Sequence, residues 1–334
     1  MIKSVNKIQR VTIIGAGRRV KNDVLPSFEI CSDIFSITNI FAKSSHEIKT
    51  PDHTYNTKSV NEITQKLIDN TDVIYIAVPQ PVVASVLKKI HRLDVSKICL
   101  IIDTPVFSLR YLANVRYLKK FARIVVAEDA IMMPWIPLVG QALKTKIKKF
   151  SFEKSLFRYH GLATIKALAG CDAISHMRYN RITHCFTMEL ANGVSGTVCE
   201  PRDYVQGTFV IEGASGVRVT DNLNEHEHAI VLRPIVRDGF CVAIEAGDHV
   251  VRLSPEEVQL LGSVSASSTI TSLTHQIKRV GLSRMLRNIA DGEGRLLDCA
   301  LNDVIEDEVT RMIGNWFDGI PVARLLRRIV NLLQ

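Results

Sequence analysis

A short apolar strand that runs directly into a glycine turn limits the possible folds of this chain more than any other feature. The run 11–14 reads Val-Thr-Ile-Ile, which is typical of a short, fully buried parallel strand. Gly15 permits a sharp turn, and Gly17 lets the backbone approach a pyrophosphate where the first N–H groups of the next helix favour an anion. The pattern predicts a dinucleotide-binding turn, even though Val20 stands where a third glycine often occurs.

The chain continues to about Lys144 as an alternation of short buried strands and helices. Ser59 and Glu62 form a capping box that indicates the start of one helix. Such an alternation with short connections predicts a parallel, doubly wound Rossmann sheet, with ligands bound at the C-terminal ends of the strands. The expected strands are 37–42, 72–79, 97–102 and 124–127, and the expected helices are 59–70, 81–90 and 108–121.

From about Ala173 the sequence changes to strands joined by tight turns. Asn192-Gly193 and Asp238-Gly239 favour hairpins that join 183–190 to 195–200 and 230–236 to 240–246. The chain is expected to be helical again from Thr269, ending in one amphipathic stretch from Leu301 to Arg328. The predicted fold class is α/β, with a Rossmann domain at 1–130. An α+β domain with a largely antiparallel sheet is expected at 131–334.

Composition narrows the class of protein. The 334 residues suffice for two domains, and 46% hydrophobic with 23% charged residues is typical of a soluble globular protein. No apolar stretch approaches the roughly 20 residues of a membrane span, and the first ten residues lack the apolar core of a secretory signal. The net charge is +8, but aromatic residues make up only 6% and do not alternate with the basic clusters. We therefore expect neither a nucleic-acid nor a membrane partner.

Seven cysteines occur without a C-x-x-C pair. This pattern indicates buried thiols in a reducing compartment rather than a disulfide framework, so we expect a cytoplasmic protein. The run Glu225–His228 contains residue types that bind metals, but no third ligand is indicated nearby. We interpret it as an exposed polar turn and expect no metal site.

The end of the second strand indicates which dinucleotide binds. NAD-specific versions of this fold place an acidic residue there for the ribose 2′-hydroxyl. This chain has Lys43, Ser44 and Ser45 instead, with no carboxylate before Glu47. A lysine and two hydroxyls suit a 2′-phosphate, so NADP is expected and NAD is the alternative. Arg18 and Arg19 of the glycine turn are further candidates to bind this 2′-phosphate. The alternative interpretation is that Lys43 is an exposed lysine without a ligand.

Several short segments follow one another in an order that matches a known family. They are the glycine turn, Ala77-Val78-Pro79 with Pro81, Thr104-Pro105, Tyr159-His160 with Leu168-Ala169-Gly170, and Leu190-Ala191-Asn192-Gly193 leading to Ile211-Glu212-Gly213-Ala214-Ser215-Gly216. In this order the chain resembles the glucose-fructose oxidoreductase/inositol dehydrogenase superfamily over about residues 10 to 320. The resemblance implies a Rossmann domain followed by an α/β domain that binds substrate and whose open sheet mediates oligomerisation, here as a homodimer or homotetramer. It also implies a nicotinamide cofactor, bound in part by Ala77, Val78, Pro79, Asp103, Thr104 and Pro105, and hydride transfer on a sugar, a nucleotide sugar or a related polyol.

His160 is the main catalytic candidate, because it matches the family's histidine and an imidazole titrates near neutral pH. Tyr159 is its neighbour. Glu128 and Asp129 end a strand at the ligand-binding edge and are candidates to hold sugar hydroxyls or tune a neighbour's pKa. The structural alternatives are a core histidine and carboxylates that cap the following segment.

Two departures from the family pattern bear on catalysis. The family commonly carries Glu-Lys-Pro, with a lysine near the reacting carbon, where this chain has Thr104. The family's aspartate one helical turn before the histidine is replaced by Leu156. Three functions are consistent with the sequence: an NADP-dependent sugar oxidoreductase, a non-catalytic dinucleotide-binding sensor or assembly protein, and a reductase of an imine or other non-sugar group.

Overall fold

The computed structural model describes residues 8–225, 229–317 and 321–333. The chain divides into two compact units: Met1–Glu128, Leu282–Val304 and Leu325–Gln334 form the first, and Asp129–Gly281 and Ile305–Arg324 form the second. The first unit therefore includes two segments that the sequence-based division placed in the second domain. His226, Glu227 and His228 of the polar run lie outside the described residues.

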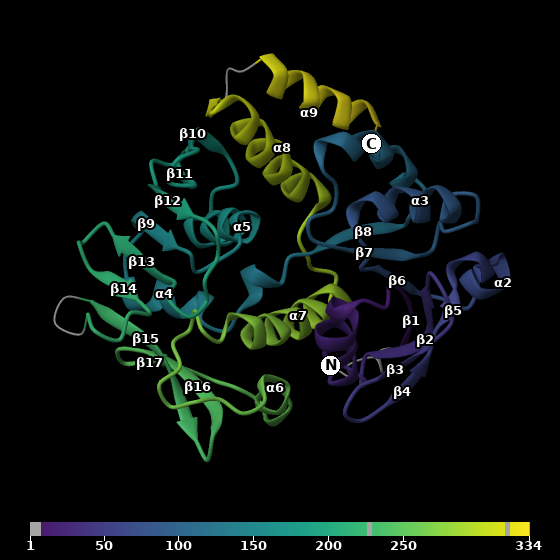
Figure 1. Ribbon diagram of the computed structural model, residues 1–334, viewed down its shortest axis with the longest axis horizontal. Helices are drawn as coiled ribbons and strands as arrows, with labels where there is room; N and C mark the ends of the chain where they lie inside the picture. Colours follow the sequence, from purple (N-terminus) through teal and green to yellow (C-terminus); the bar gives the residue numbers. More distant parts are fainter. Residues whose placement is uncertain (1–7, 226–228, 318–320, 334) are drawn as a thin grey trace, which may run out of the picture. The chain divides into compact units, whose positions relative to one another are not determined.

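The first unit is built on a parallel sheet of six strands in the order β5-β2-β1-β6-β7-β8 (Figure 1). The apolar runs predicted as strands form its centre, where all four residues of β6 are buried. The Rossmann fold class is thus confirmed, and its ligand-binding edge is the one at which β1 enters the glycine turn. The strands are β1 (Gln9–Ile14), β2 (Phe35–Ala42), β5 (Lys58–Ser59), β6 (Val73–Ile76), β7 (Cys99–Asp103) and β8 (Arg123–Ala127), and β3 (Glu47–Lys49) and β4 (Thr54–Asn56) form a separate hairpin.

The helices of this unit agree only in part with the prediction. The capping box of Ser59 is present, but it caps the short 3-10 turn η2, and extended backbone at Ile63 and Thr64 interrupts the helix expected over 59–70. Ile63 is buried, which explains why the chain leaves the helical path to reach the core. The helical elements are η1 (Val20–Val24), α1 (Leu25–Glu29), η2 (Val60–Glu62), α2 (Gln65–Ile68), α3 (Gln80–Ile90) and η3 (Leu109–Leu118).

The segment expected as a helix over 108–121 is a 3-10 helix, η3. Its apolar residues Leu112, Val115 and Leu118 are spaced three apart and are all buried. A strict three-residue spacing aligns side chains on one face of a helix with three residues per turn, whereas an α-helix would rotate them out of line. The three-residue spacing of these buried side chains therefore fits a 3-10 helix.

The second unit contains a mixed, mostly antiparallel sheet of ten strands, with α4 (Ile136–Leu143) and α5 (Arg158–Ala169) packed on it (Figure 1). Both hairpins predicted from Asn192-Gly193 and Asp238-Gly239 are present. The order is β17-β16-β15-β14-β13-β9-β12-β11-β10-β18. The bounds are β9 (Ile147–Glu153), β10 (Ile174–Asn180), β11 (Cys185–Leu190), β12 (Ser195–Cys199), β13 (Thr208–Gly213), β14 (Arg218–Thr220), β15 (Ile230–Arg237), β16 (Phe240–Ala246), β17 (His249–Arg252) and β18 (Asn315–Phe317).

The C-terminal part of the chain is helical as expected, but the first helix begins at Thr274 rather than Thr269, and the single stretch expected from Leu301 to Arg328 is wrong. Gly314 adopts a φ of 85° after α8, and the chain then forms β18, which pairs with β10. A left-handed φ stops a helix, and glycine adopts it without steric cost. None of the helices in the described part of the chain is long and apolar enough to span a bilayer. The helices are η4 (Asp129–Met132), α6 (Pro255–Leu261), α7 (Thr274–Ala290), α8 (Leu297–Ile313) and α9 (Pro321–Leu333).

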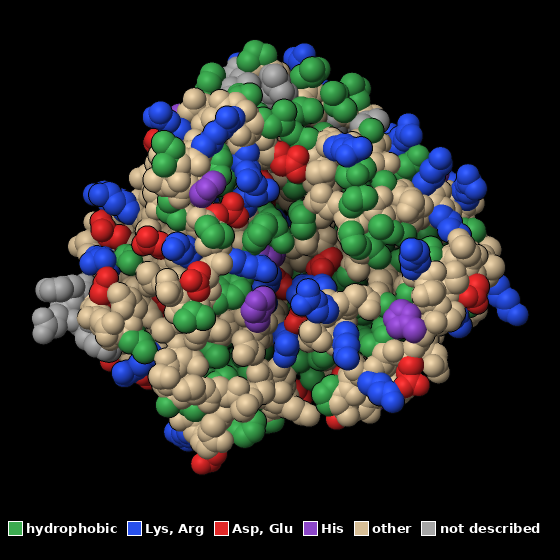
Figure 2. All heavy atoms as spheres, in the orientation of Figure 1, with side chains coloured by type: hydrophobic (Ala, Val, Ile, Leu, Met, Phe, Trp, Pro, Cys, Tyr) green, Lys and Arg blue, Asp and Glu red, His purple; other side chains and the backbone are tan. Residues whose placement is uncertain are grey.

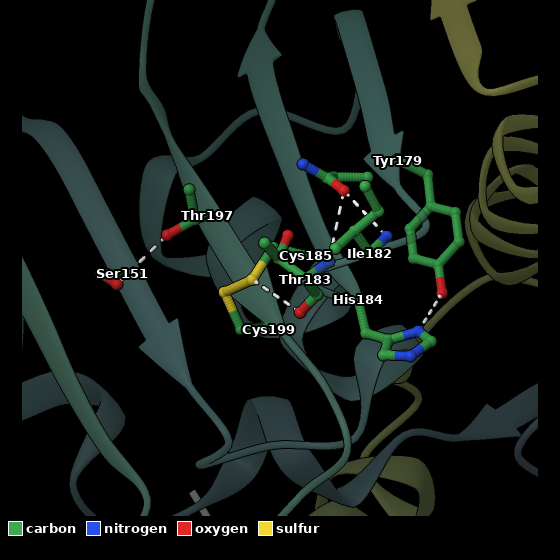
Figure 3. Close-up of a disulfide and its surroundings, with 9 residues drawn as sticks. Ser151, Tyr179, Ile182, Thr183, His184, Cys185, Thr197 and Cys199 are labelled. Carbon is green, nitrogen blue, oxygen red and sulfur yellow. Dashed lines mark hydrogen bonds between the residues drawn. A yellow bond between two sulfur atoms is a disulfide. The ribbon is translucent and has the colours of Figure 1, made fainter.

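Cys185 and Cys199 form a disulfide between β11 and β12 (Figure 3). The expectation of unpaired thiols is wrong for this pair, and the other five cysteines, all within the described residues, form no disulfide. The two residues are register partners in the antiparallel ladder, which brings their side chains together on one face of the sheet. Strand register is not visible in cysteine spacing, so the sequence did not reveal the bond.

Basic side chains are dispersed on one face of the molecule (Figure 2). On the face drawn in Figure 2, Lys and Arg side chains are scattered among neutral and acidic ones rather than gathered into one continuous patch.

Candidate functional site

A pocket of about 630 Å³ in the first unit lies where β1, β2 and β6 end. It brings together seven of the residues predicted to bind the dinucleotide, and their common position at the C-terminal ends of parallel strands is where this fold binds ligands. The residues that line it are Gly15, Ala16, Gly17, Phe41, Ala42, Lys43, Ser44, His46, Ser59, Val60, Asn61, Ala77, Val78, Pro79, Val82, Ser85, Val86 and Lys89. Ser45, Arg18, Arg19 and the segment Asp103–Pro105 are not among them.

The two glycines of the turn have different roles. Gly15 has a φ of +134°, and a Cβ placed on it would lie 2.2 Å from the carbonyl oxygen of Ala77. It is therefore required for the close approach of the turn to the end of β6. A Cβ on Gly17 meets no atom within 4 Å. Gly17 thus leaves open space on the pocket side of the turn, where a pyrophosphate needs it.

The part of the pocket beyond β2 is basic and polar. Lys43, Ser44 and His46 are all exposed there, and none of the residues that line the pocket is Asp or Glu. His46 was missed in the sequence analysis, and its ring Nδ1 lies 2.9 Å from the carbonyl oxygen of Ser44. Lys89 was also missed, and its ammonium donates to the carbonyl oxygen of Val60 at 2.6 Å. The sequence could have indicated these two residues only by their positions, because His46 follows the end of β2 and Lys89 lies on α3.

Arg19 extends toward β7 rather than toward Lys43. Its Nε and Nη2 donate to the two carboxylate oxygens of Asp103 at 3.0 and 3.1 Å, and the hydroxyl of Tyr75 donates to the same carboxylate at 3.0 Å. In the strand order, β7 and β2 lie on opposite sides of β1. The structure therefore does not bring Arg19 together with the lysine and serines at β2, and Arg18 is exposed.

Thr104 and Pro105 follow β7 and are joined by a cis peptide bond. The Thr104 hydroxyl donates to the carbonyl oxygen of Ala127 at 3.4 Å. This hydroxyl stands where the family that the sequence resembles carries a lysine, and it can hydrogen-bond but does not ionise near neutral pH. Glu128 follows Ala127 directly, is 3% exposed, and is the last residue of the first unit's opening segment.

In the second unit, His160 near the start of α5 contacts a lysine that the sequence analysis did not single out. Lys278 of α7 places its Nζ 2.6 Å from His160 Nε2 and 3.2 Å from Asp129 Oδ1. Asp129 is fully buried, and His160 is 4% exposed. An ammonium group has no acceptor, so the Nε2 atom accepts from Lys278 and neutral His160 carries its proton on Nδ1. The three side chains form an acid–lysine–histidine chain.

The surroundings of His160 agree with the predicted helix and with the departures from the family pattern. The ring of Tyr159 lies 4.2 Å from the His160 ring, centroid to centroid. Leu156 is buried one turn earlier. An apolar side chain there offers neither a charge nor an acceptor to the imidazole. Lys278 supplies charge from a different element.

A second buried acid lies in the same unit. Asp307 of α8 accepts from Arg158 Nε at 2.5 Å, and Arg158 also pairs with Glu200 at 3.7 Å. Burial raises the pKa of Asp307 to about 6, against the opposing charge and hydrogen bond of Arg158. Arg158 is therefore engaged by two carboxylates and fixes the start of α5.

Comparisons with known proteins agree with this architecture. No family model and no curated sequence matches the chain. Among solved structures, an oxidoreductase from Thermotoga maritima superposes with a TM-score of 0.58 at 14% identity, covering 98% of this chain and 100% of that one. At this identity the likeness shows a shared fold. Myo-inositol 2-dehydrogenase from Lactobacillus plantarum gives 0.54 at 12% identity, covering 98% of both chains. A levoglucosan dehydrogenase in complex with NADH and levoglucosan gives 0.57 at 14%, covering 92% of this chain and 97% of that one.

Proposed function

We propose that the protein is an NADP-dependent oxidoreductase that transfers a hydride between nicotinamide and a carbonyl or hydroxyl carbon of a sugar-like substrate. The observation that carries this proposal is the contact of His160 with Lys278, backed by Asp129. A buried imidazole with a charged hydrogen-bond partner is suited to proton transfer. The structural neighbours named above include sugar and polyol dehydrogenases, which agrees with this chemistry.

The dinucleotide pocket of the first unit fits the cofactor. The Gly15–Gly17 turn leaves room for a pyrophosphate. No Asp or Glu lines the pocket, so the carboxylate that accepts from the ribose 2′-hydroxyl of NAD has no counterpart among the lining residues. Lys43, Ser44 and His46 instead suit a 2′-phosphate, because it accepts charge-assisted hydrogen bonds. These residues favour NADP over NAD.

The chemistry of the second unit is proton transfer. Nicotinamide supplies or accepts the hydride, and the substrate oxygen must then gain or lose a proton. In reduction, the Nδ1–H of neutral His160 is donated to the substrate oxygen, while Nε2 takes a proton from the ammonium of Lys278. Asp129 lies beside the lysine that gives up this proton. Oxidation reverses both proton transfers. Tyr159 and Glu128 are the next candidates for contact with substrate.

Lys278 also supplies a positive charge that the segment Asp103–Pro105 lacks, where the family carries a lysine. Thr104 replaces the lysine of the Glu-Lys-Pro segment, and a threonine carries no charge. Lys278 reaches the histidine from α7 instead. The site therefore contains a positive charge, but a residue of α7 carries it instead of a residue after β7.

Assembly through the open sheet face of the second unit remains part of the proposal. Ser151 and Thr197 hydrogen-bond on the face opposite the buried Phe150 and Phe152, and this small, polar surface suits pairing with a second copy (Figure 3). We propose a homodimer or homotetramer, working in the cytoplasm.

The test is a cofactor-coupled screen. The protein is incubated with NADPH or NADP⁺ and a panel of aldoses, ketoses, polyols and nucleotide sugars, and absorbance at the nicotinamide band is followed. We expect turnover with at least one member and a faster rate with NADP(H) than with NAD(H). Binding of NADPH without any turnover would favour the second candidate, a non-catalytic sensor, which Leu156 and Thr104 motivate.

A further inference from the structure

A series of side-chain contacts in the second unit connects the two sides of His160. On one side, Lys278 contacts the imidazole, and His275 lies three residues earlier on the same face of α7. On the other side, the Tyr159 ring lies 4.2 Å from the His160 ring and 4.7 Å from the Phe157 ring. Both branches lead to the loop 200–207, between β12 and β13.

Two residues of that loop close the series. The Tyr204 ring meets the His275 ring edge to face, with centroids 4.8 Å apart. The Arg202 Cζ lies over the Tyr204 ring at 5.5 Å and over the Phe157 ring at 5.4 Å. Arg202 is therefore linked to His160 by successive ring contacts through Phe157 and Tyr159. Its second aromatic partner, Tyr204, contacts His275, which precedes Lys278 by three residues on α7.

The loop that carries Arg202 is held in place by its own hydrogen bonds. Asp203 Oδ1 accepts from the backbone N–H groups of Val205 and Gln206 at 3.0 and 3.3 Å. The N–H of Asp203 donates to the carbonyl oxygen of Lys154 at 2.8 Å. A Cβ on Gly207 would lie 2.6 Å from a backbone oxygen, so the turn closes tightly. The position of Arg202 is fixed by the fold and requires no charged partner.

Arg158 and Arg202, which flank Phe157, differ in their partners. Arg158 pairs with Asp307 and Glu200. For Arg202, the described part of the chain provides two aromatic rings and no carboxylate within ion-pair distance. Contacts over a ring use the plane of a guanidinium and leave its N–H edge available. Arg202 is exposed, so this edge is open to a ligand.

We propose that Arg202 binds an anionic group of the substrate, and that the substrate is therefore an acidic sugar derivative carrying a carboxylate or a phosphate. This proposal rests on the oxidoreductase function proposed above. A guanidinium edge binds either anion through two parallel N–H···O contacts. The net charge of +8 adds a long-range attraction for such a ligand.

The experiment is a calorimetric titration of three probes that share one sugar ring: glucose, glucuronate and glucose 6-phosphate. Each is titrated into the full chain saturated with NADP⁺. Arg202→Met removes the charge while keeping an apolar stem on the aromatic rings, and Arg202→Lys keeps a charge without the fork. Arg237→Met is the matched control, because Arg237 is an exposed arginine on β15 outside this series of contacts. Thermal melts check that each variant is folded.

We expect at least one anionic probe to bind wild type about ten- to a hundredfold more tightly than glucose, as for a charge-assisted hydrogen bond. Arg202→Met should abolish this difference, Arg202→Lys should keep part of it, and Arg237→Met should leave it intact. Which of the two anions gains identifies the carboxylate or the phosphate. Equal binding of all three probes, no binding of either anion, or an unchanged preference in Arg202→Met overturns the proposal.

Because binding is measured without turnover, the two proposals fail separately. Arg202-dependent binding of an anion with no oxidation or reduction of any substrate contradicts the oxidoreductase function alone. Turnover of neutral sugars with a kcat/KM that Arg202→Met leaves unchanged contradicts the anionic substrate alone.

Discussion

Lys278 Nζ lies 2.6 Å from His160 Nε2, although the two residues stand 118 positions apart in the chain. Lys278 is paired in turn with the fully buried Asp129. The lysine acts through the imidazole, so we assign it as a positioning residue. It fixes the Nδ1-protonated tautomer of neutral His160 and carries a positive charge into the site.

Replacing Lys278 should therefore affect kcat more than substrate affinity. We expect Lys278→Met to lower kcat by about ten- to a hundredfold, the size of a lost charge-assisted hydrogen bond, with little change in KM. Lys278→Arg should recover part of the rate, and Lys146→Met, an exposed lysine of the same unit, should have no effect. Nitrogen NMR of the His160 ring should show the Nδ1–H tautomer in wild type and a mixture in Lys278→Met. An unchanged tautomer would contradict the positioning role.

Cofactor choice should depend on Lys43. Fluorescence titration is expected to show tighter binding of NADPH than of NADH. We expect Lys43→Asp to weaken NADPH binding by about tenfold or more, because it replaces the partner of the 2′-phosphate with a like charge, and to narrow or reverse the preference. Lys66→Asp changes the same charge at an exposed position outside the pocket and is the control. Equal affinities for NADPH and NADH in wild type would contradict the argument.

Substitutions at the two glycines of the turn should have different effects, one on the stability of the fold and the other on NADPH affinity. Gly17→Val should melt within a few degrees of wild type but lose NADPH affinity, because its side chain enters only open space at the pocket. Gly15→Ala should destabilise the protein by more than about 2 kcal/mol, since a left-handed φ and a backbone overlap act together. Urea unfolding and NADPH titration of both variants provide the test. A stable Gly15→Ala, or tight NADPH binding by Gly17→Val, would show that the turn has been misinterpreted.

The buried carboxyl of Asp307 should make stability depend on pH. Its folded-state pKa is raised to about 6 from 3.8, so the folded protein holds this proton more tightly than the unfolded chain. The stabilising contribution is complete below pH 3.8 and is lost as the pH rises through about 6. A shift of this size corresponds to a decrease of about 3 kcal/mol in the free energy of unfolding.

Asp307→Asn should remove this dependence. We expect the free energy of unfolding of wild type to fall more steeply between pH 5 and 7 than that of the variant, measured by urea unfolding at each pH. Glu153→Gln, at an exposed carboxyl of β9, should keep the wild-type slope. Parallel slopes for wild type and Asp307→Asn would contradict the raised pKa.

Local sequence patterns predicted those parts of the fold that depend on local chemistry. The β-branched runs before Gly15 and Pro79 gave the central strands, and Asn192-Gly193 and Asp238-Gly239 gave two hairpins. The errors arose where tertiary contacts decide. Ile63 leaves the helical path to reach the core, and only strand register brings Cys185 and Cys199 together.

Only those site residues could be predicted whose position follows from the Rossmann fold class. The glycine turn and Lys43 follow from the Rossmann pattern, and the structure places both at one pocket. Arg19 carried the same signal as Arg18, but its guanidinium is bound to Asp103, 84 residues away in sequence. Lys278 lies on α7 among other basic residues, and nothing in its neighbourhood distinguishes it. Long-range pairing is not encoded in spacing, so such residues are found only in three dimensions.

The most direct test of the account is the effect of His160→Ala on turnover and on NADPH binding, measured together on the best substrate of the screen. His160 belongs to the second unit and the dinucleotide pocket to the first. We predict an NADPH dissociation constant within about twofold of wild type and a kcat lower by about two to four orders of magnitude, the size of a general acid–base contribution. Near-normal kcat in His160→Ala would contradict the central claim, and the proton would then have to pass through another group.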